Sequence, residues 1–416
     1  LAGFGAEPQG SVLGGREMSG DIFKPADILL PNVSDMRVWS VIACDQFSSD
    51  GDYWDRVAAY VGGAPSTLRM ILPEARLGER AHEDFAREIS LAMQSYLEKG
   101  IFREYGNSLV YVERKLSNGR VRRGLVGAID LESYDYSPDS RAPVRASEMT
   151  VPDRLPPRVA ARASASLELP HVIALLDDAE MSVIEPLGRR KDSFEKLYSF
   201  DLMEGGGHIA GWRVPDGETE RVAGLVNGLR GEAIMIIGDG NHSLAAAKAR
   251  WDEMKRNGAK DAPARYALAE LNNVYDPAVE FKAIHRAVFG VDARQFVRDM
   301  ERAIGGPGRY RVGWRSSGES GEFAAAASCI GDAIEAVQSF IDDASGKTGC
   351  RVDYIHGGDA LESLSAARDN VGIIMPAMDK SDFFGAVLSR GVFPRKSFSI
   401  GESRDKRYYL ECRKIV

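Results

Sequence analysis

The residues best placed to do chemistry lie in one short stretch, where a polar glycine turn follows an apolar run. The run from Ala233 to Ile237 predicts a buried strand, and Gly238-Asp-Gly240 predicts a tight turn. A helix then begins near Asn241 and continues through alanines that allow close packing on a sheet. The first amides of such a helix attract an anion, and the helix dipole contributes about 0.3–1 kcal/mol to its binding.

Four polar side chains would surround an anion at this turn, and two glycines would let the backbone approach it. These residues are Gly238, Asp239, Gly240, Asn241, His242 and Ser243. An ordinary strand-to-helix connection has the same spacing, so both interpretations stay open. The stretch is not a P-loop, because the chain has no G-x-x-x-x-G-K-[ST]. It is not a dinucleotide fingerprint, because Leu244 replaces the third glycine.

Three further segments carry side chains that could complete an anion site. The first is a polar, proline-rich connection from residue 132 to 169, and connections of that length are usually functional or disordered. The second is a polar pair inside an apolar strand, and the third is a basic turn stiffened by Pro394. The candidates in chain order are Arg145, Glu148, Arg154, His285, Arg286, Arg395 and Lys396. A solvated loop, a satisfied buried histidine and a solvated basic turn are the respective alternatives.

The composition excludes several classes of protein. With 416 residues, 44% hydrophobic and 27% charged, the chain has the size of two or three globular domains. A net charge of −8 argues against a dominant nucleic-acid surface. No apolar run approaches the roughly 20 residues that span a bilayer. The four cysteines are scattered without a C-x-x-C pair, which favours a reduced cytoplasmic protein, for which a homodimer is a common state.

The periodicity of the chain predicts an α+β fold in three parts. Residues 1–20 are expected to be a disordered tail. Residues 21–290 would form a mixed α/β core with inserted hairpins, including one at Asn118-Gly119. Residues 291–416 would form a C-terminal α/β module that returns a last strand, 407–415, to the core. Further predictions are a strand at 38–44, helices at 52–61 and 79–99, a second hairpin at 198–214, and strands at 265–271 and 281–289.

The motifs together resemble the family catalogued as domain of unknown function 1015 (DUF1015), over nearly the whole chain from Asp21. They are Asp21-Ile-Phe-Lys-Pro25, the loop from Arg145 to Arg154, Ile237-Gly-Asp-Gly-Asn-His-Ser243, Ile284-His-Arg286 and Phe393-Pro-Arg-Lys-Ser397. Family members more often read Ala-Asp-Gly-His-His-Arg at the glycine turn. Asn241 and Ser243 replace the first His and the Arg here, which removes one cation from a phosphate cradle. The family has no settled activity.

The glycine turn followed by His is also distantly similar to the nucleotide site of the ParB and sulfiredoxin superfamily. That group includes partition proteins that bind and hydrolyse CTP, sulfiredoxins that use ATP, and free-serine kinases. The resemblance implies a small mixed-sheet core of this type, with a nucleoside triphosphate such as ATP or CTP at the turn and the helix start.

These observations favour an enzyme that binds a nucleoside triphosphate with Mg²⁺ and transfers a phosphoryl group to a small acceptor or to water. The amides of residues 240–243 would hold phosphates, and Arg145, Arg154 and Arg286 would neutralise developing charge. Asp239 and Glu148 are candidates for Mg²⁺ ligand or general base, and His242 for phosphate donor or proton shuttle. The alternatives are a nucleotide-regulated module of the partition type and a non-catalytic binder of an acidic metabolite.

Overall fold

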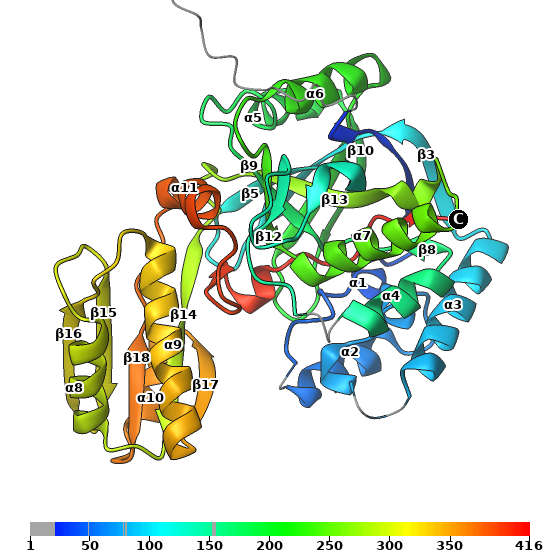
Figure 1. The fold of residues 1–416 in the computed structure, drawn as a ribbon. Coiled ribbons are helices and arrows are strands. Elements are labelled where there is room, and N and C mark those ends of the chain that lie inside the picture. The colour runs from blue at the N-terminus through cyan, green and yellow to red at the C-terminus, as the bar shows by residue number, and fades with distance from the viewer. Residues whose placement is uncertain (1–20, 49, 78, 80, 152–154) are drawn as a thin grey trace, which may run out of the picture.

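The computed structural model describes residues 21–416 except 49, 78, 80 and 152–154. The predicted tail and Arg154 therefore lie outside the described residues. The chain forms a larger lobe, a smaller lobe and an extended strand between them (Figure 1). No helix in the described part of the chain has both the length and the apolar character needed to cross a membrane.

A mixed sheet forms the centre of the larger lobe. Its strands pair in the order β10 (Glu195–Asp201), β11 (His208–Arg213), β4 (Val110–Lys115), β5 (Val121–Asp130), β13 (Tyr266–Asn273), β9 (Ile173–Leu176), β12 (Met235–Asp239), β7 (Val144–Ala146) and β6 (Tyr134–Asp135), and β1 (Phe23–Lys24) pairs with β5. Strand β9 is parallel to β13 and antiparallel to β12, which is parallel to β7. The expectation of a mixed-sheet α/β protein is confirmed.

A second sheet forms the smaller lobe. It pairs β16 (Glu319–Ala324), β15 (Arg311–Ser316), β18 (Asn370–Ile374), β14 (Phe281–Phe289) and β17 (Arg351–His356), and β19 (Phe398–Ile400) pairs with the start of β14. Strand β14 therefore belongs to the second sheet, although the sequence placed it in the core. Two small ladders join β2 (Ala26–Pro31) to β3 (Phe102–Ser108) and β8 (Leu167–Glu168) to β20 (Arg413–Lys414).

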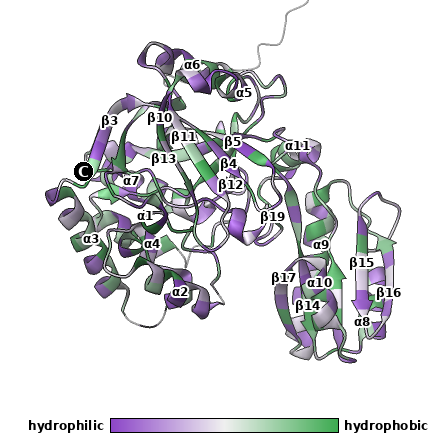
Figure 2. Ribbon diagram, turned by 180° about the vertical axis from the view of Figure 1, so that it is seen from behind, coloured by the Kyte–Doolittle hydropathy of each residue, from purple (hydrophilic) through white to green (hydrophobic). Residues whose placement is uncertain are grey.

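Helices cover both sheets, and the most hydrophobic stretches concentrate in the strands (Figures 1 and 2). The helices of the larger lobe are α1 (Met36–Trp39), α2 (Gly51–Val61), α3 (His82–Glu98), α4 (Leu155–Ser164), α5 (Glu185–Gly188), α6 (Asp216–Gly228) and α7 (Asn241–Arg256). Those that follow β14 are α8 (Ala293–Ile304), α9 (Ile330–Thr348), α10 (Gly358–Ser365) and α11 (Lys380–Arg390). One apolar cluster contains Leu175 and Ile236 of the large sheet together with Phe398 and Ile400, so the two lobes share a core.

The local patterns predicted most elements within a few residues. Both hairpins, the long helix α3 and the strands β13 and β14 are confirmed. The predicted strand at 38–44 is wrong, because Asp35 caps a short helix there and leaves only Ile42 in a bridge to Tyr408. The connection at 132–169 also contains more structure than expected. It holds β7 and α4, whose prolines fall in the first turn, where the missing N–H groups have no helical partner.

The predicted last strand is an extended tail that a buried ion cluster anchors. The Arg407 guanidinium donates to Glu270 Oε2 at 2.7 Å and to Glu411 Oε2 at 2.5 Å, and all three side chains are at most 2% exposed. Arg122 Nε lies 3.8 Å from the other carboxylate oxygen of Glu270, Oε1. Arg114, also buried, donates to the backbone carbonyls of Arg404 and Lys406. The charges of Arg407 and Arg122 lower the pKa of Glu270 even though burial opposes this.

Replacing Arg407 with Met should lower the free energy of unfolding by about 3–5 kcal/mol, because two buried carboxylates would lose their shared cation. Chemical denaturation of the variant and the parent measures this difference. The exposed Arg404→Met is the matched control and should change stability by less than about 1 kcal/mol. An equally small effect of Arg407→Met would contradict a structural role for the cluster.

Candidate functional site

The glycine turn has the predicted strand–turn–helix form, and a different structural constraint requires glycine at each of its two glycine positions. Gly240 joins β12 to α7 with φ +81°, a left-handed conformation that favours glycine. A Cβ at Gly238 would overlap the side chain of Ile400, so glycine lets β19 of the closing segment approach the turn. The turn is therefore a contact point between the larger lobe and the segment that returns from the smaller one.

The loop after β7 closes over the first turn of α7 through two side chains of the motif. The Asn241 amide accepts from Ser147 N at 3.1 Å and donates to Ser147 Oγ at 3.1 Å. His242 Nε2 accepts from Val151 N at 3.2 Å, so this nitrogen carries no proton in the arrangement observed. The two contacts fix the loop that carries Glu148 directly beside the start of the helix.

The basic segment 393–397 meets the same loop. Phe393 N donates to Ser147 O at 2.7 Å, and Met149 N donates to Phe393 O at 2.9 Å. The Glu148 carboxylate accepts from Ser397 N at 3.1 Å. Three motifs that lie far apart in the sequence, namely the glycine turn, the loop after β7 and the basic segment, therefore meet at the junction of the lobes.

A lysine that the sequence reading missed lies at the centre of this junction. Lys406 Nζ lies 3.3 Å from Asp239 Oδ2, and the two side chains are 7% and 13% exposed. Asp45, also missed, is half-buried, and the pKa-raising effect of burial is outweighed by the charge of His171, a hydrogen bond from Gln46 and the charge of Lys406, which lower its pKa. For Lys406 the available signal was the charged run from Arg404 to Arg407 at the start of the predicted last strand, because such charges need partners when buried.

Glu148 has an unusual electrostatic position. Burial raises its pKa to about 6, although hydrogen bonds from the backbone of Ser397 and Lys396 and the charges of Lys396 and Lys406 act in the opposite direction. A carboxyl group with a pKa near 6 exchanges protons close to neutral pH, which suits a general acid or base.

Two histidines of the smaller lobe border the junction. His285 Nδ1 accepts from Met375 N at 3.2 Å, and burial together with Arg286 lowers its pKa. His356 has its pKa lowered to about 4 by burial, by Lys396 and Lys406, and by His285. Both imidazoles are therefore neutral at physiological pH and can accept protons or hydrogen bonds.

The predicted arginines are divided between interior and surface. Arg145 is 4% exposed, donates to the carbonyls of Ala142 and Glu232, and has its pKa lowered by burial. Arg286 is fully buried, donates to Gln338 Oε1 at 2.8 Å and lies over the Tyr354 ring, and burial lowers its pKa to about 10. Both guanidinium groups are thus engaged within the protein.

Arg395 and Lys396, by contrast, are exposed on the basic segment. The Arg395 guanidinium lies 5.9 Å from the centre of the Tyr354 ring. Lys396 has φ +59°, a left-handed backbone that is uncommon for a residue other than glycine and that often marks functional segments. These two cations are the ones that a solvent-borne anion can reach.

The carboxylates alone do not form a metal cage. Within the described residues, no group of three or more His, Cys, Asp or Glu is close enough to hold a metal ion. Asp239 Oδ2 is buried and has no hydrogen-bond partner, with only the ion pair to Lys406 beside it. A carboxylate oxygen of this kind suits a Mg²⁺ ion that is bound mainly through substrate phosphates and water, with one or two protein carboxylates as further ligands.

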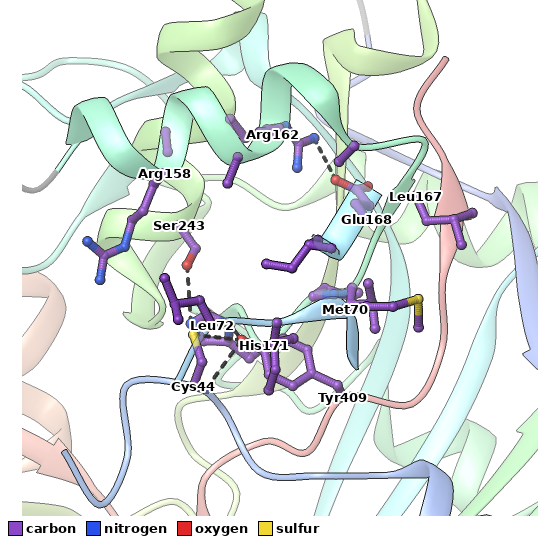
Figure 3. Close-up of a pocket in the computed structure, with 18 of the residues that line it drawn as sticks. Cys44, Met70, Leu72, Arg158, Arg162, Leu167, Glu168, His171, Ser243 and Tyr409 are labelled. Carbon is purple, nitrogen blue, oxygen red and sulfur yellow. Dashed lines mark hydrogen bonds and ion pairs between the residues drawn. The ribbon is translucent and has the colours of Figure 1, made fainter. Parts of the chain in front are cut away.

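Ser243 begins a hydrogen-bonded chain that continues through three further side chains. Ser243 Oγ lies 3.2 Å from His171 Nε2, and His171 Nδ1 lies 2.8 Å from the Tyr409 hydroxyl. Tyr409 donates in turn to Cys44 Sγ at 3.1 Å (Figure 3). Burial raises the pKa of Cys44 to about 12, so the thiol stays protonated. The sequence reading named Ser243 but missed the other three residues.

The fold and the site define a two-lobed mixed α/β protein with a polar junction between its lobes. The chain belongs to the family described as protein of unknown function (DUF1015), whose model matches residues 24–371. Membership of this family is the resemblance that the motifs predicted. A comparison with the curated proteins finds no match.

Several solved structures are similar to parts of this chain at low identity. SbnI with a C-terminal truncation from Staphylococcus aureus is 10% identical with a TM-score of 0.36, over 66% of this chain and 83% of that one. A free serine kinase in complex with AMP is 13% identical with a TM-score of 0.36, over 69% and 90%. A conserved hypothetical protein from Pyrococcus furiosus is 13% identical with a TM-score of 0.33, over 68% and 90%. With TM-scores below 0.5, these structures establish no ligand or activity for this chain.

The raised pKa of Glu148 predicts a pH-dependent stability difference. The folded state binds the proton more tightly than the unfolded chain, so Glu148 lowers stability as the pH rises from about 4.5 through about 6. Glu148→Gln removes this effect and keeps an acceptor oxygen for Ser397. Chemical denaturation at the two pH values measures this effect. When the pH is raised from about 4.5 to about 7.5, the free energy of unfolding of the variant should rise by about 1–2 kcal/mol relative to that of the parent. A difference that is the same at both pH values would show that Glu148 has an ordinary pKa.

Proposed function

We propose that this protein is a nucleotide-binding enzyme that transfers a phosphoryl group, with Mg²⁺, from a nucleoside triphosphate to a small acceptor or to water. The observation that supports this proposal best is the set of charged groups at the junction. A helix N-terminus, two exposed cations and a buried lysine lie next to two carboxylates, Asp239 at the end of β12 and Glu148 in the loop after β7. A bound anion would neutralise the charges of the lysines and the arginine, and a divalent cation would neutralise those of the carboxylates. Either ion alone would leave one of these two sets of charges without a counterion.

The phosphates would lie between the start of α7 and the basic segment. The amides of the first turn of α7 and its dipole favour an anion there. Arg395 and Lys396 are exposed and belong to a segment that hydrogen bonds hold against the loop after β7. Phosphoryl transfer requires mainly positioning and charge stabilisation, and this arrangement provides both.

Asp239 and Glu148 are the residues that would contact Mg²⁺ or the attacking group. When bound, Mg²⁺ would neutralise phosphate charge and orient the transferred group. Glu148, with a pKa near 6, is also suited to accept a proton at neutral pH. A core of the ParB and sulfiredoxin type, a cytoplasmic location and a homodimer are further parts of this proposal. Binding without turnover would favour the non-catalytic binder of an acidic metabolite.

A thermal-shift series with ATP, CTP, GTP and ADP, each with and without Mg²⁺, tests binding. A nucleotide at about 100 times its dissociation constant should add about 2.7 kcal/mol of stability. Lys396→Asn removes the charge and retains a residue that tolerates the left-handed backbone. It should weaken nucleotide binding by roughly 10- to 100-fold, the equivalent of one charged hydrogen bond. The exposed Lys99→Asn is the matched control and should leave affinity unchanged. No shift with any nucleotide would refute the proposal.

Asp239→Asn tests the role of the carboxylate in turnover. Asn keeps an oxygen that can accept from Gly240 N, as Asp239 does at 3.2 Å, but it loses the negative charge. We expect Mg²⁺-dependent turnover to fall by about 100-fold or more, with nucleotide affinity roughly intact. The measurements are kcat with Mg²⁺ and the dissociation constant from titration calorimetry. An equal loss of binding and rate would assign Asp239 to nucleotide binding instead.

A further inference from the structure

A largely apolar pocket of about 580 Å³ opens beside the Ser243 chain (Figure 3). Its volume lies within the range of small-molecule sites, which run from about 300 to 1,000 Å³. Helices α3, α4 and α7 and strand β13 contribute its walls. Representative lining side chains are Met70, Phe85, Ile89, Ala161, Leu244 and Leu268.

The charged residues that line the pocket already form pairs with one another. Arg162 contacts Glu168 at 2.6 Å, and Arg158 forms an ion pair with Glu74. A charged ligand would have to compete with these pairs, whereas a neutral apolar body leaves both pairs intact. The wall chemistry therefore favours a mainly apolar, neutral ligand, whose polar group can be recognised at the Ser243 end; Arg162 Nε is a buried donor without a hydrogen-bond partner in the same wall.

The hydrogen bonds at that end fix which nitrogen of His171 is the base. The Tyr409 hydroxyl donates to Cys44 Sγ and accepts from Cys44 N at 3.3 Å, so it is also an acceptor for His171 Nδ1–H. In the neutral form of the ring, His171 Nε2 then has its lone pair directed at Ser243 Oγ. His171 itself is only 5% exposed, and a hydroxyl group of a ligand entering the pocket would meet this nitrogen.

We propose that the pocket binds the apolar body of a small primary alcohol, whose hydroxyl group lies at Ser243 and His171 and accepts the phosphoryl group. This inference rests on the proposed phosphoryl transfer and names its acceptor class. A Cβ at Gly240 would lie 3.4 Å from Cδ2 of His171, so this end of the pocket borders the glycine turn and the hydroxyl would lie close to the terminal phosphate. In the step, the alcohol oxygen bonds to the γ-phosphorus and the bond to the β–γ bridging oxygen breaks. The hydroxyl proton passes to His171 Nε2, and the products are a nucleoside diphosphate and a phosphate monoester.

The pocket is tested without nucleotide, using the neutral dye Nile red and its displacement by 1-octanol. Ala161→Phe places a ring into the pocket from α4, and Ala160→Phe places the same ring on the exposed face of that helix. Ala161→Phe should weaken dye and octanol binding by at least about tenfold, while Ala160→Phe should not change it. Both variants should keep the thermal shift with ATP. Equal affinities in the two variants and the parent would overturn the pocket as a ligand site.

The acceptor role is tested by incubating the protein with ATP, Mg²⁺ and 1-octanol and measuring octyl phosphate by mass spectrometry. His171→Gln should reduce its formation by about 100-fold or more, with the ATP shift unchanged. ATP binding and hydrolysis without octyl phosphate would overturn the alcohol as acceptor. Octanol binding without any nucleotide shift would refute the proposed phosphoryl transfer, and with it the acceptor role, while leaving the pocket as a binding site.

Discussion

The buried arginine–carboxylate cluster around Arg407 is the interaction on which the candidate site depends. Glu270 of β13 lies in the middle of the large sheet, and Glu411 belongs to the tail, so Arg407 ties the tail to the sheet. A buried ion pair adds little net stability over an apolar core, but it tolerates no alternative register. A shift of the tail would leave a buried charge without its partner. The cluster therefore acts mainly by fixing one position of residues 404–412.

The neighbours of Arg407 gain their positions from this anchor. Lys406 is directed to Asp239 at the glycine turn, and Tyr409 to His171 beside the pocket. Tyr408, between them, donates to the carbonyl of Met203 and is fully buried. A segment of four residues thus contacts the glycine turn through Lys406 and the pocket side through Tyr409. The two halves of the candidate site share a single structural support.

The sequence predicted the parts of the site that depend on local geometry. The turn at Gly238 and Gly240 and the basic segment near Lys396 follow from patterns a few residues long. The proline-containing helix α4 was missed because Pro156 and Pro157 break a helix in its interior but not in its first turn. Lys406 was missed for a different reason, since its partner is defined only by the tertiary fold.

The same reason explains the failure to predict the chain from Ser243 to Cys44. Tyr409 and His171 lie 238 positions apart, and Arg407 and Glu270 lie 137 apart. No periodicity of a strand or helix extends over such separations. The charges of the tail were nevertheless visible. A run that alternates Lys, Arg and Glu with large aromatic residues is unusual for an exposed strand, and it indicates buried pairs once the partners are known.

The long separation between His171 and Tyr409 has a consequence for synthesis. Translation adds roughly 5–20 residues per second, so the 238 positions between them require roughly 10 to 50 seconds. During that interval the glycine turn and the walls of the pocket can form, but neither Lys406 nor Tyr409 exists to complete them. A nascent or prematurely terminated chain therefore has an incomplete site, and the site is completed only after the tail has been synthesised and has docked on the sheet.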